Sequence, residues 1–179
     1  MTAVVVAAVA VIALAVGALR RDGVTFFLWW HDAFEVKAER APAAHATLTD
    51  LTLTLDLPHV RLFVTSAMAP AAFAVRRRDL IAVGLEGPLL ERLTPQEVRG
   101  TLALLVALLA NPGSWRRERD AADWAAIEEL AAKLTSADAV AAALAALASA
   151  QRDPTTRERL MAELWPDVRT LVRKAPPRR

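Results

Sequence analysis

The sequence predicts an α+β fold: a small β-containing portion, then an α-helical remainder, both behind an N-terminal membrane helix. Three observations predict it. Residues 3–19 carry no charged side chain, strand-like apolar runs gather between residues 48 and 83, and helical signals dominate from residue 94 onward. Because strands and helices do not alternate along the chain, α+β is expected rather than α/β.

The first element is an apolar run of 17 residues, residues 3–19, which ends at Arg20 and Arg21. As a helix it would span roughly 25 Å, the short end of a bilayer core. A signal peptide would need basic residues before the run and a small-residue cleavage site after it, and neither is present. We expect a transmembrane anchor over residues 1–22 that contacts membrane lipid through residues 3–19. A buried helix is the alternative.

The two arginines also predict an orientation, because positive charge favours the cytoplasmic side of a membrane. The expected location is therefore a single-pass membrane protein with its domain in the cytoplasm. Residues 23–46 are expected to form an interfacial or linker segment, in which Trp29 and Trp30 suit the headgroup layer and residues 35–46 are polar and irregular. An aromatic piece of the domain core is the competing interpretation of the tryptophans.

The expected domain covers residues 47–174, before a disordered basic tail at 175–179. Residues 48–57 show a strand pattern, because leucines at every second position alternate with Thr52, Thr54 and Asp56. Residues 60–65 are a second strand candidate. Two short runs, 71–75 and 80–83, predict a hairpin with a charged loop, and residues 89–93 a helical turn.

A capped helix follows. Thr94 suits the N-cap, Pro95 the first helical position, and Glu97 completes a capping box three residues after Thr94. Residues 111–113, Asn-Pro-Gly, end the helix. Residues 102–110 are apolar on every side, so this helix must be buried.

The rest of the chain is expected to be helical, with caps at Ser114 and Ser136 and a third helix from Asp153 that is broken at residues 165–166. The net charge is +2 with a pI near 9.6. The basic residues form short clusters without a recognition motif or interleaved aromatics, so nucleic acid is not an expected partner. The chain has no cysteine, which excludes disulfides and thiolate metal ligands.

The order of three segments resembles the HtpX-type membrane zinc metallopeptidases of the gluzincin class. In that family a hairpin with an Asn-Ala-Phe-Ala-like segment precedes a turn and the active-site helix. Here residues 70–74 read Pro-Ala-Ala-Phe-Ala, residues 80–83 follow, and residues 89–98 match the lead-in to that helix. The resemblance covers about residues 48–150 and implies a gluzincin-like, minigluzincin-type domain with a zinc cofactor.

The metal-binding motif of the family does not accompany the resemblance. Its His-Glu-x-x-His places two zinc ligands and a general base on one helix face. The matching positions hold Leu104, Leu105 and Leu108. The third-ligand position falls on Trp124 or, in a second register, on Arg119. None of these side chains can replace the carboxylate or imidazole, so neither a catalytic residue nor a metal ligand is expected.

These observations favour a non-catalytic pseudopeptidase that binds a peptide or protein. The expected peptide site is an edge strand at Ala71, Ala72, Phe73, Ala74 and Val75, beside a leucine-lined surface that is either a groove or a dry core. The alternatives are an active enzyme with an unrecognised site and a structural membrane protein.

The only histidines, His31, His45 and His59, are each fourteen residues from the next. They lack helix-face spacing for a metal site, so we expect His45 and His59 to cap or line loops.

Overall fold

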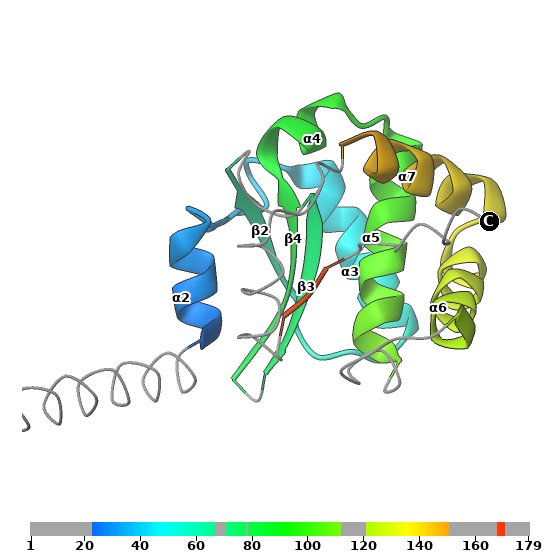
Figure 1. The fold of residues 1–179 in the computed structure, drawn as a ribbon, viewed down its shortest axis with the longest axis horizontal. Helices are drawn as coiled ribbons and strands as arrows, with labels where there is room; N and C mark the ends of the chain where they lie inside the picture. Colours follow the sequence, from blue (N-terminus) through cyan, green and yellow to red (C-terminus); the bar gives the residue numbers. More distant parts are fainter. Residues whose placement is uncertain (1–22, 67–70, 78, 112–120, 151–167, 171–179) are drawn as a thin grey trace, which may run out of the picture.

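A computed structural model describes residues 23–66, 71–77, 79–111, 121–150 and 168–170 of the 179-residue chain. The α+β expectation is confirmed: a small mixed sheet carries helix α2 on one face and the larger helices on the other (Figure 1). The predicted anchor, the basic tail and the helix from Asp153 lie outside the described residues. Within them, no helix combines the length and hydrophobicity needed to cross a membrane.

The sheet has the order β1-β2-β4-β3-β5, so it is not built in chain order. β2 runs parallel to β4, and the other neighbours are antiparallel. Two of the strand predictions, residues 60–65 and the hairpin of 71–75 with 80–83, are confirmed as β2, β3 and β4. The strands are β1 (Phe34–Glu35), β2 (Arg61–Thr65), β3 (Ala72–Arg77), β4 (Leu80–Glu86) and β5 (Val168–Thr170).

Helix α2 (Gly23–Trp30) covers one face of the sheet through a small aromatic cluster. Phe73 lies opposite Gly84 in the β3–β4 register, and its ring occupies the space that a side chain at Gly84 would fill, 2.1 Å from a built Cβ. Phe27 of α2 meets the same ring edge to face at 5.1 Å between centroids. The last two residues of α2, Trp29 and Trp30, are 69% and 41% exposed, so they are not part of this core.

Residues 42–54 form helix α3 (Pro42–Thr54), so the predicted strand over residues 48–57 is wrong. The buried residues Ala44, Leu48 and Leu51 follow helical spacing, whereas Leu53 is 73% exposed. The Thr52 hydroxyl donates to the Leu48 carbonyl at 2.9 Å, a bond available only in a helix turn. The irregular structure expected up to residue 46 is also absent from Pro42 onward.

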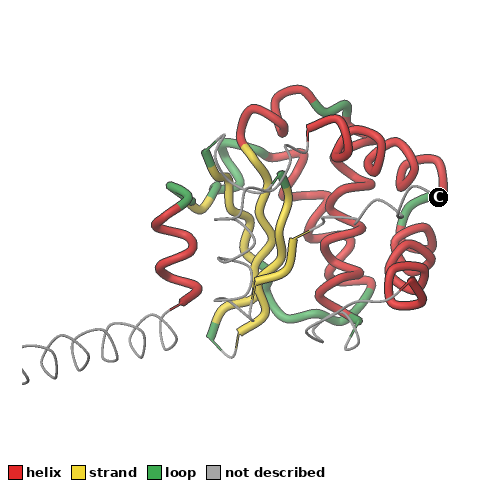
Figure 2. Tube along the Cα trace, viewed as in Figure 1, coloured by secondary structure: helices red, strands yellow, loops and turns green. Residues whose placement is uncertain are grey.

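The other large helices surround α5 (Pro95–Ala110), which runs between the sheet with α3 and the pair α6 and α7 (Figures 1 and 2). Gly100 permits the closest approach: a Cβ there would lie 2.1 Å from the Ala139 carbonyl oxygen and 2.9 Å from the Ala143 Cβ of α7. The expected helices after residue 114 and residue 136 are confirmed where the structure describes them. The elements around α5 are α4 (Gly87–Arg92), α6 (Ala121–Leu134) and α7 (Ala137–Ala150).

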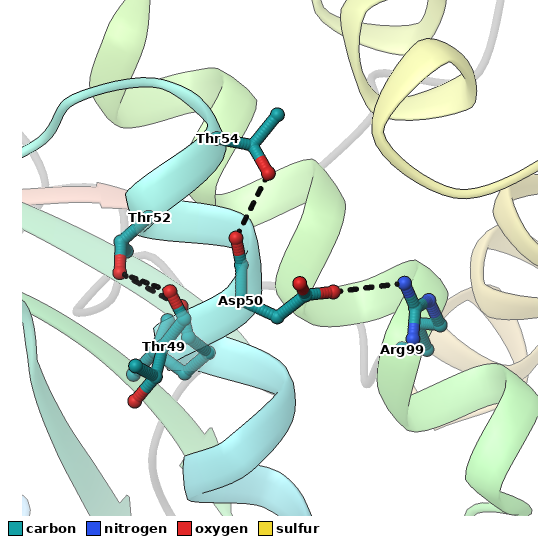
Figure 3. A network of polar contacts seen from close by, with 6 residues as sticks. Thr49, Asp50, Thr52, Thr54 and Arg99 are labelled. Atoms are coloured by element: carbon teal, nitrogen blue, oxygen red, sulfur yellow. Dashed lines mark hydrogen bonds and ion pairs between the residues drawn. The ribbon is translucent and has the colours of Figure 1, made fainter.

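One ion pair joins the surfaces of α3 and α5 (Figure 3). Arg99 Nη2 lies 3.0 Å from Asp50 Oδ2, and both side chains are exposed. The neighbouring Thr54 hydroxyl donates to the Asp50 carbonyl at 2.9 Å. An exposed pair of this kind stabilises a fold by less than about 1 kcal/mol, so apolar packing carries the α3–α5 contact.

Candidate functional site

The helix at the centre of the resemblance, α5, begins and ends as its sequence predicts. The Thr94 hydroxyl accepts from the Glu97 backbone N–H at 3.3 Å, and the Thr94 N–H donates to Glu97 Oε2 at 2.7 Å, which completes the capping box. The Thr94 hydroxyl also donates to Glu97 Oε2 at 2.8 Å, and the donations from the Thr94 backbone and hydroxyl together lower the pKa of Glu97. At the far end, Arg76 of β3 donates from Nη1 to the Leu109 carbonyl at 2.7 Å, where helix carbonyls lack intrahelical donors.

The leucines at the positions that the sequence analysis matched to the family motif face a sealed interior. Leu104, Leu105 and Leu108 each have 0% of their surface exposed. They belong to one continuous apolar core that also includes side chains of α3, the sheet, α6 and α7. The groove that the sequence left open as an alternative is therefore not formed at these leucines, because the sheet and the helices α3, α6 and α7 pack around α5.

Trp124, the preferred match to the third-ligand position, lies on α6 and is partly buried against the same core. Its indole fills space beside the core rather than presenting a carboxylate to α5. Arg119, the match in the second register, lies outside the described residues. The match of Trp124, rather than Arg119, to the third-ligand position therefore stays a prediction.

The residues around α5 do not fit a zinc ion. Zinc takes nitrogen, sulfur or oxygen donors, and an aliphatic leucine has none. In the described part of the chain no three histidine, aspartate, glutamate or cysteine side chains gather closely enough to hold a metal ion. No chemical step through zinc can be assigned to the side chains of this helix.

The histidines divide between two sides of the sheet. His31 is buried at the end of α2 and meets the Phe27 ring edge to face at 4.6 Å. His45 and His59 instead share the lining of one open cavity of about 180 Å³ beside α3, which sequence reasoning missed. We did not predict this cavity because we expected a strand over residues 48–57. The helix α3 that forms there instead places His45 in the same cavity lining as His59. The cavity is lined by His45, Leu48, Thr49, Thr52, Leu53, Leu57, His59 and Val60.

A short polar cluster lies next to this cavity. His45 Nε2 contacts the Val36 carbonyl at 2.5 Å, so this nitrogen carries the proton. Glu35 of β1 forms an ion pair with Arg61 of β2, and the Arg61 hydrogen bond is the main reason that the pKa of Glu35 is lowered. Both partners are more than one third exposed, so the pair adds little to stability.

The expected peptide-binding strand is not an edge strand. β3 pairs with β4 on one side and, at Phe73, Ala74 and Val75, with β5 on the other. The side chains from Ala72 to Val75 are at most 3% exposed, and Ala71 just before the strand is partly buried. The predicted edge position is wrong because residues 168–170 pair with β3 from a distance in sequence that no local pattern reveals, and peptide binding at this strand stays a prediction.

The comparisons with known proteins support an HtpX-like relationship in part of the chain. The Protease HtpX homolog of Persephonella marina (strain DSM 14350 / EX-H1) is 30% identical over 96 residues, which is 48% of this chain and 33% of that protein. The alignment thus spans about a third of the relative's length. No family model matches the chain, and no solved structure matches it.

Proposed function

We propose that this chain is a membrane-anchored, HtpX-like pseudopeptidase that keeps the scaffold of the family without its zinc chemistry. The partial alignment with an HtpX homologue supports the relationship. The order of hairpin, α4 and capped α5 agrees with it, because these are the elements that carry the sequence resemblance. The proposal holds that Leu104, Leu105 and Leu108 replace the zinc ligands and general base.

One observation carries the non-catalytic part of the proposal: those three leucines are completely buried. A hydrolytic site needs a polarised water and access for a peptide bond. A leucine core provides neither a lone pair nor a path for water, and each buried leucine stabilises the fold by roughly 1.5–3 kcal/mol. The helix that would hold the reaction centre in an active relative therefore serves here as the main packing element.

The remaining role is binding at the membrane surface. The apolar run at residues 3–19 would place the domain beside lipid, and Arg20 and Arg21 favour its cytoplasmic side. A sheet whose strand β3 already accepts an added strand has the backbone geometry to hold an extended peptide. We therefore propose a peptide or protein partner, bound without being cut.

The test is a casein-hydrolysis assay of the full chain in mild detergent, with zinc supplied and then removed by a chelator. The HtpX homologue of Persephonella marina, assayed in parallel, is the positive control. The proposal predicts no chelator-sensitive hydrolysis by the full chain. Hydrolysis that stops on chelation and returns with zinc would overturn it in favour of an active enzyme with an unrecognised site.

A further inference from the structure

The end of helix α2 exposes two large apolar side chains. Trp29 and Trp30 are 69% and 41% exposed, and we call these two residues the aromatic patch. Among the described residues, the other exposed large apolar side chains are Leu53 and Phe34, and Phe34 lies four residues after Trp30. Single exposed apolar residues are ordinary on a protein surface, whereas adjacent exposed tryptophans mark an interaction site.

The two sides of α2 have different surroundings. Val24 and Phe27, with His31 just after the helix, follow the spacing of one helix face, and all three are buried. Thr25 and Trp29 lie one turn apart, away from that face, and both are exposed. The helix carries no charged residue. A helix that is apolar on all sides requires protein or lipid around it, and the sheet covers only one side of α2.

A helix cap holds the end of α2 that carries the aromatic patch. The Ala33 N–H donates to the Leu28 carbonyl at 2.7 Å. The Asp32 N–H donates to the Trp29 carbonyl at 3.1 Å, and Asp32 has a φ of 45°. These two bonds around a left-handed residue form a Schellman motif. A backbone hydrogen bond of 3.2 Å from the residue after β2 ties this turn to the sheet, so the fold itself sets the exposure of the patch.

The residue type and its place in the chain favour lipid as the occupant of the patch. Tryptophan combines a large apolar ring system with one N–H donor, which suits the boundary between lipid headgroups and acyl chains. The apolar run of residues 3–19 ends four residues before Gly23, where α2 begins, and Arg20 and Arg21 lie between them. Arginine suits the anionic phosphates of headgroups. A bilayer that holds the apolar run would therefore also reach α2.

We propose that α2 is an interfacial helix that lies in the headgroup layer of a phospholipid bilayer, with the aromatic patch in lipid and Val24 and Phe27 on the sheet. This inference deepens the proposed membrane association, and it rests on that association. Interfacial helices bury their apolar face about 5–10 Å into the boundary of headgroups and acyl chains. The docked helix orients the domain: the sheet lies between the bilayer and α5, and α3 lies on the side away from lipid (Figure 1).

Tryptophan fluorescence in brominated vesicles tests this placement in the full chain. The chain has five tryptophans, so Trp115→Phe, Trp124→Phe and Trp165→Phe together leave the aromatic patch as the only source of indole emission. This variant is reconstituted into vesicles of phosphatidylcholine and phosphatidylglycerol, with or without bromine near the headgroup end of the acyl chains. Bromine quenches an indole on contact, whereas iodide in the buffer quenches an indole that is exposed to water.

Leu53→Trp supplies a matched control. Leu53 is 73% exposed, close to the 69% of Trp29, but it lies on α3, across the sheet from α2. The control chain also carries Trp29→Phe and Trp30→Phe, so its only indole is the one introduced on α3. A second comparison keeps the other three tryptophans and measures the wild-type chain against Trp29→Phe with Trp30→Phe. It serves if the chain without those three tryptophans does not fold.

The expected result is strong quenching of the aromatic patch by the brominated lipid and weak quenching by iodide, with the reverse for the indole on α3. In the second comparison, brominated lipid should remove a larger share of the emission from the wild-type chain than from the double variant. Equal quenching of the two sites by brominated lipid overturns the inference. So does a patch that brominated lipid leaves unquenched, whether iodide reaches it or a second copy of the chain covers it.

Vesicle flotation separates this inference from the proposed function on which it rests. A chain that does not float with the vesicles overturns the membrane association and the interfacial helix together. A chain that floats but keeps its aromatic patch in water overturns the interfacial helix alone. Zinc content and casein hydrolysis do not depend on α2, so the proposed absence of catalysis is tested separately.

Discussion

Replacing Leu105 with glutamate introduces the residue type that the family motif has at the matching position, and it shows whether α5 lines a cleft or a core. Leu105 is completely buried. Losing its apolar contacts costs roughly 2–3 kcal/mol, and an uncharged carboxyl group without a partner costs about 1–3 kcal/mol more. We therefore expect a loss of roughly 3–6 kcal/mol in the free energy of unfolding, comparable with the whole stability of a small domain.

The pH dependence of this loss has a definite sign. Burial raises the pKa of a carboxyl group, so the folded variant would keep its proton while the unfolded chain releases it. The free energy of unfolding of Leu105→Glu should therefore decrease as the pH rises from 5 to 8. Urea titrations in mild detergent, followed by circular dichroism, measure it. Leu105→Met is the volume-matched control, and Leu53→Glu, at a position that is 73% exposed, should change stability by less than about 0.5 kcal/mol. If Leu105→Glu matched Leu53→Glu in stability and pH response, the leucines would line a wet cleft and the reasoning would be refuted.

Two further substitutions test the packing and the cap of α5. Gly100→Ala should destabilise the fold by about 1–3 kcal/mol despite the better helix propensity of alanine, because its Cβ would meet the Ala139 backbone carbonyl at 2.1 Å. Urea unfolding measures this loss. A gain in stability would show that α5 and α7 are not in close contact. Glu97→Gln keeps the capping box but cannot titrate. Because the pKa of Glu97 is lowered from 4.5, its contribution is present above that value and is lost as pH falls through the lower folded pKa. The melting temperature of the wild type should thus fall more steeply from pH 6 to pH 3 than that of Glu97→Gln, and parallel curves would contradict the role of the charge.

Local signals predicted α5 and the β3–β4 hairpin well. Thr94, Pro95 and Glu97 fix one end of the helix by short-range hydrogen bonds, and residues 102–110 allow only burial. Sequence reasoning failed at residues 48–57, where leucine at every second position also satisfies helical spacing through Leu48, Leu51 and Leu55. Pro42 at the first turn of α3 was the available signal for a helix.

The surroundings of the candidate site depended on contacts that no local pattern encodes. The sequence was compatible with either a groove or a dry core beside α5. The packing of α6 and α7 against α5 shows that the core is formed. The pairing of β5 with β3 joins segments that are far apart in the sequence. The cavity shared by His45 and His59 forms where the chain turns back after α3. Such contacts depend on the whole topology, which composition and periodicity do not determine.

We propose that α5, which matches the metal-binding helix of the family, is a packing element without zinc ligands. The zinc content of the full chain tests this proposal, measured by inductively coupled plasma mass spectrometry after incubation with excess zinc and removal of the free ion. The Persephonella marina homologue, treated identically, is the reference. We predict zinc far below one equivalent per chain of this protein. One equivalent of zinc per folded chain, retained through gel filtration and removed by a chelator, would contradict the claim.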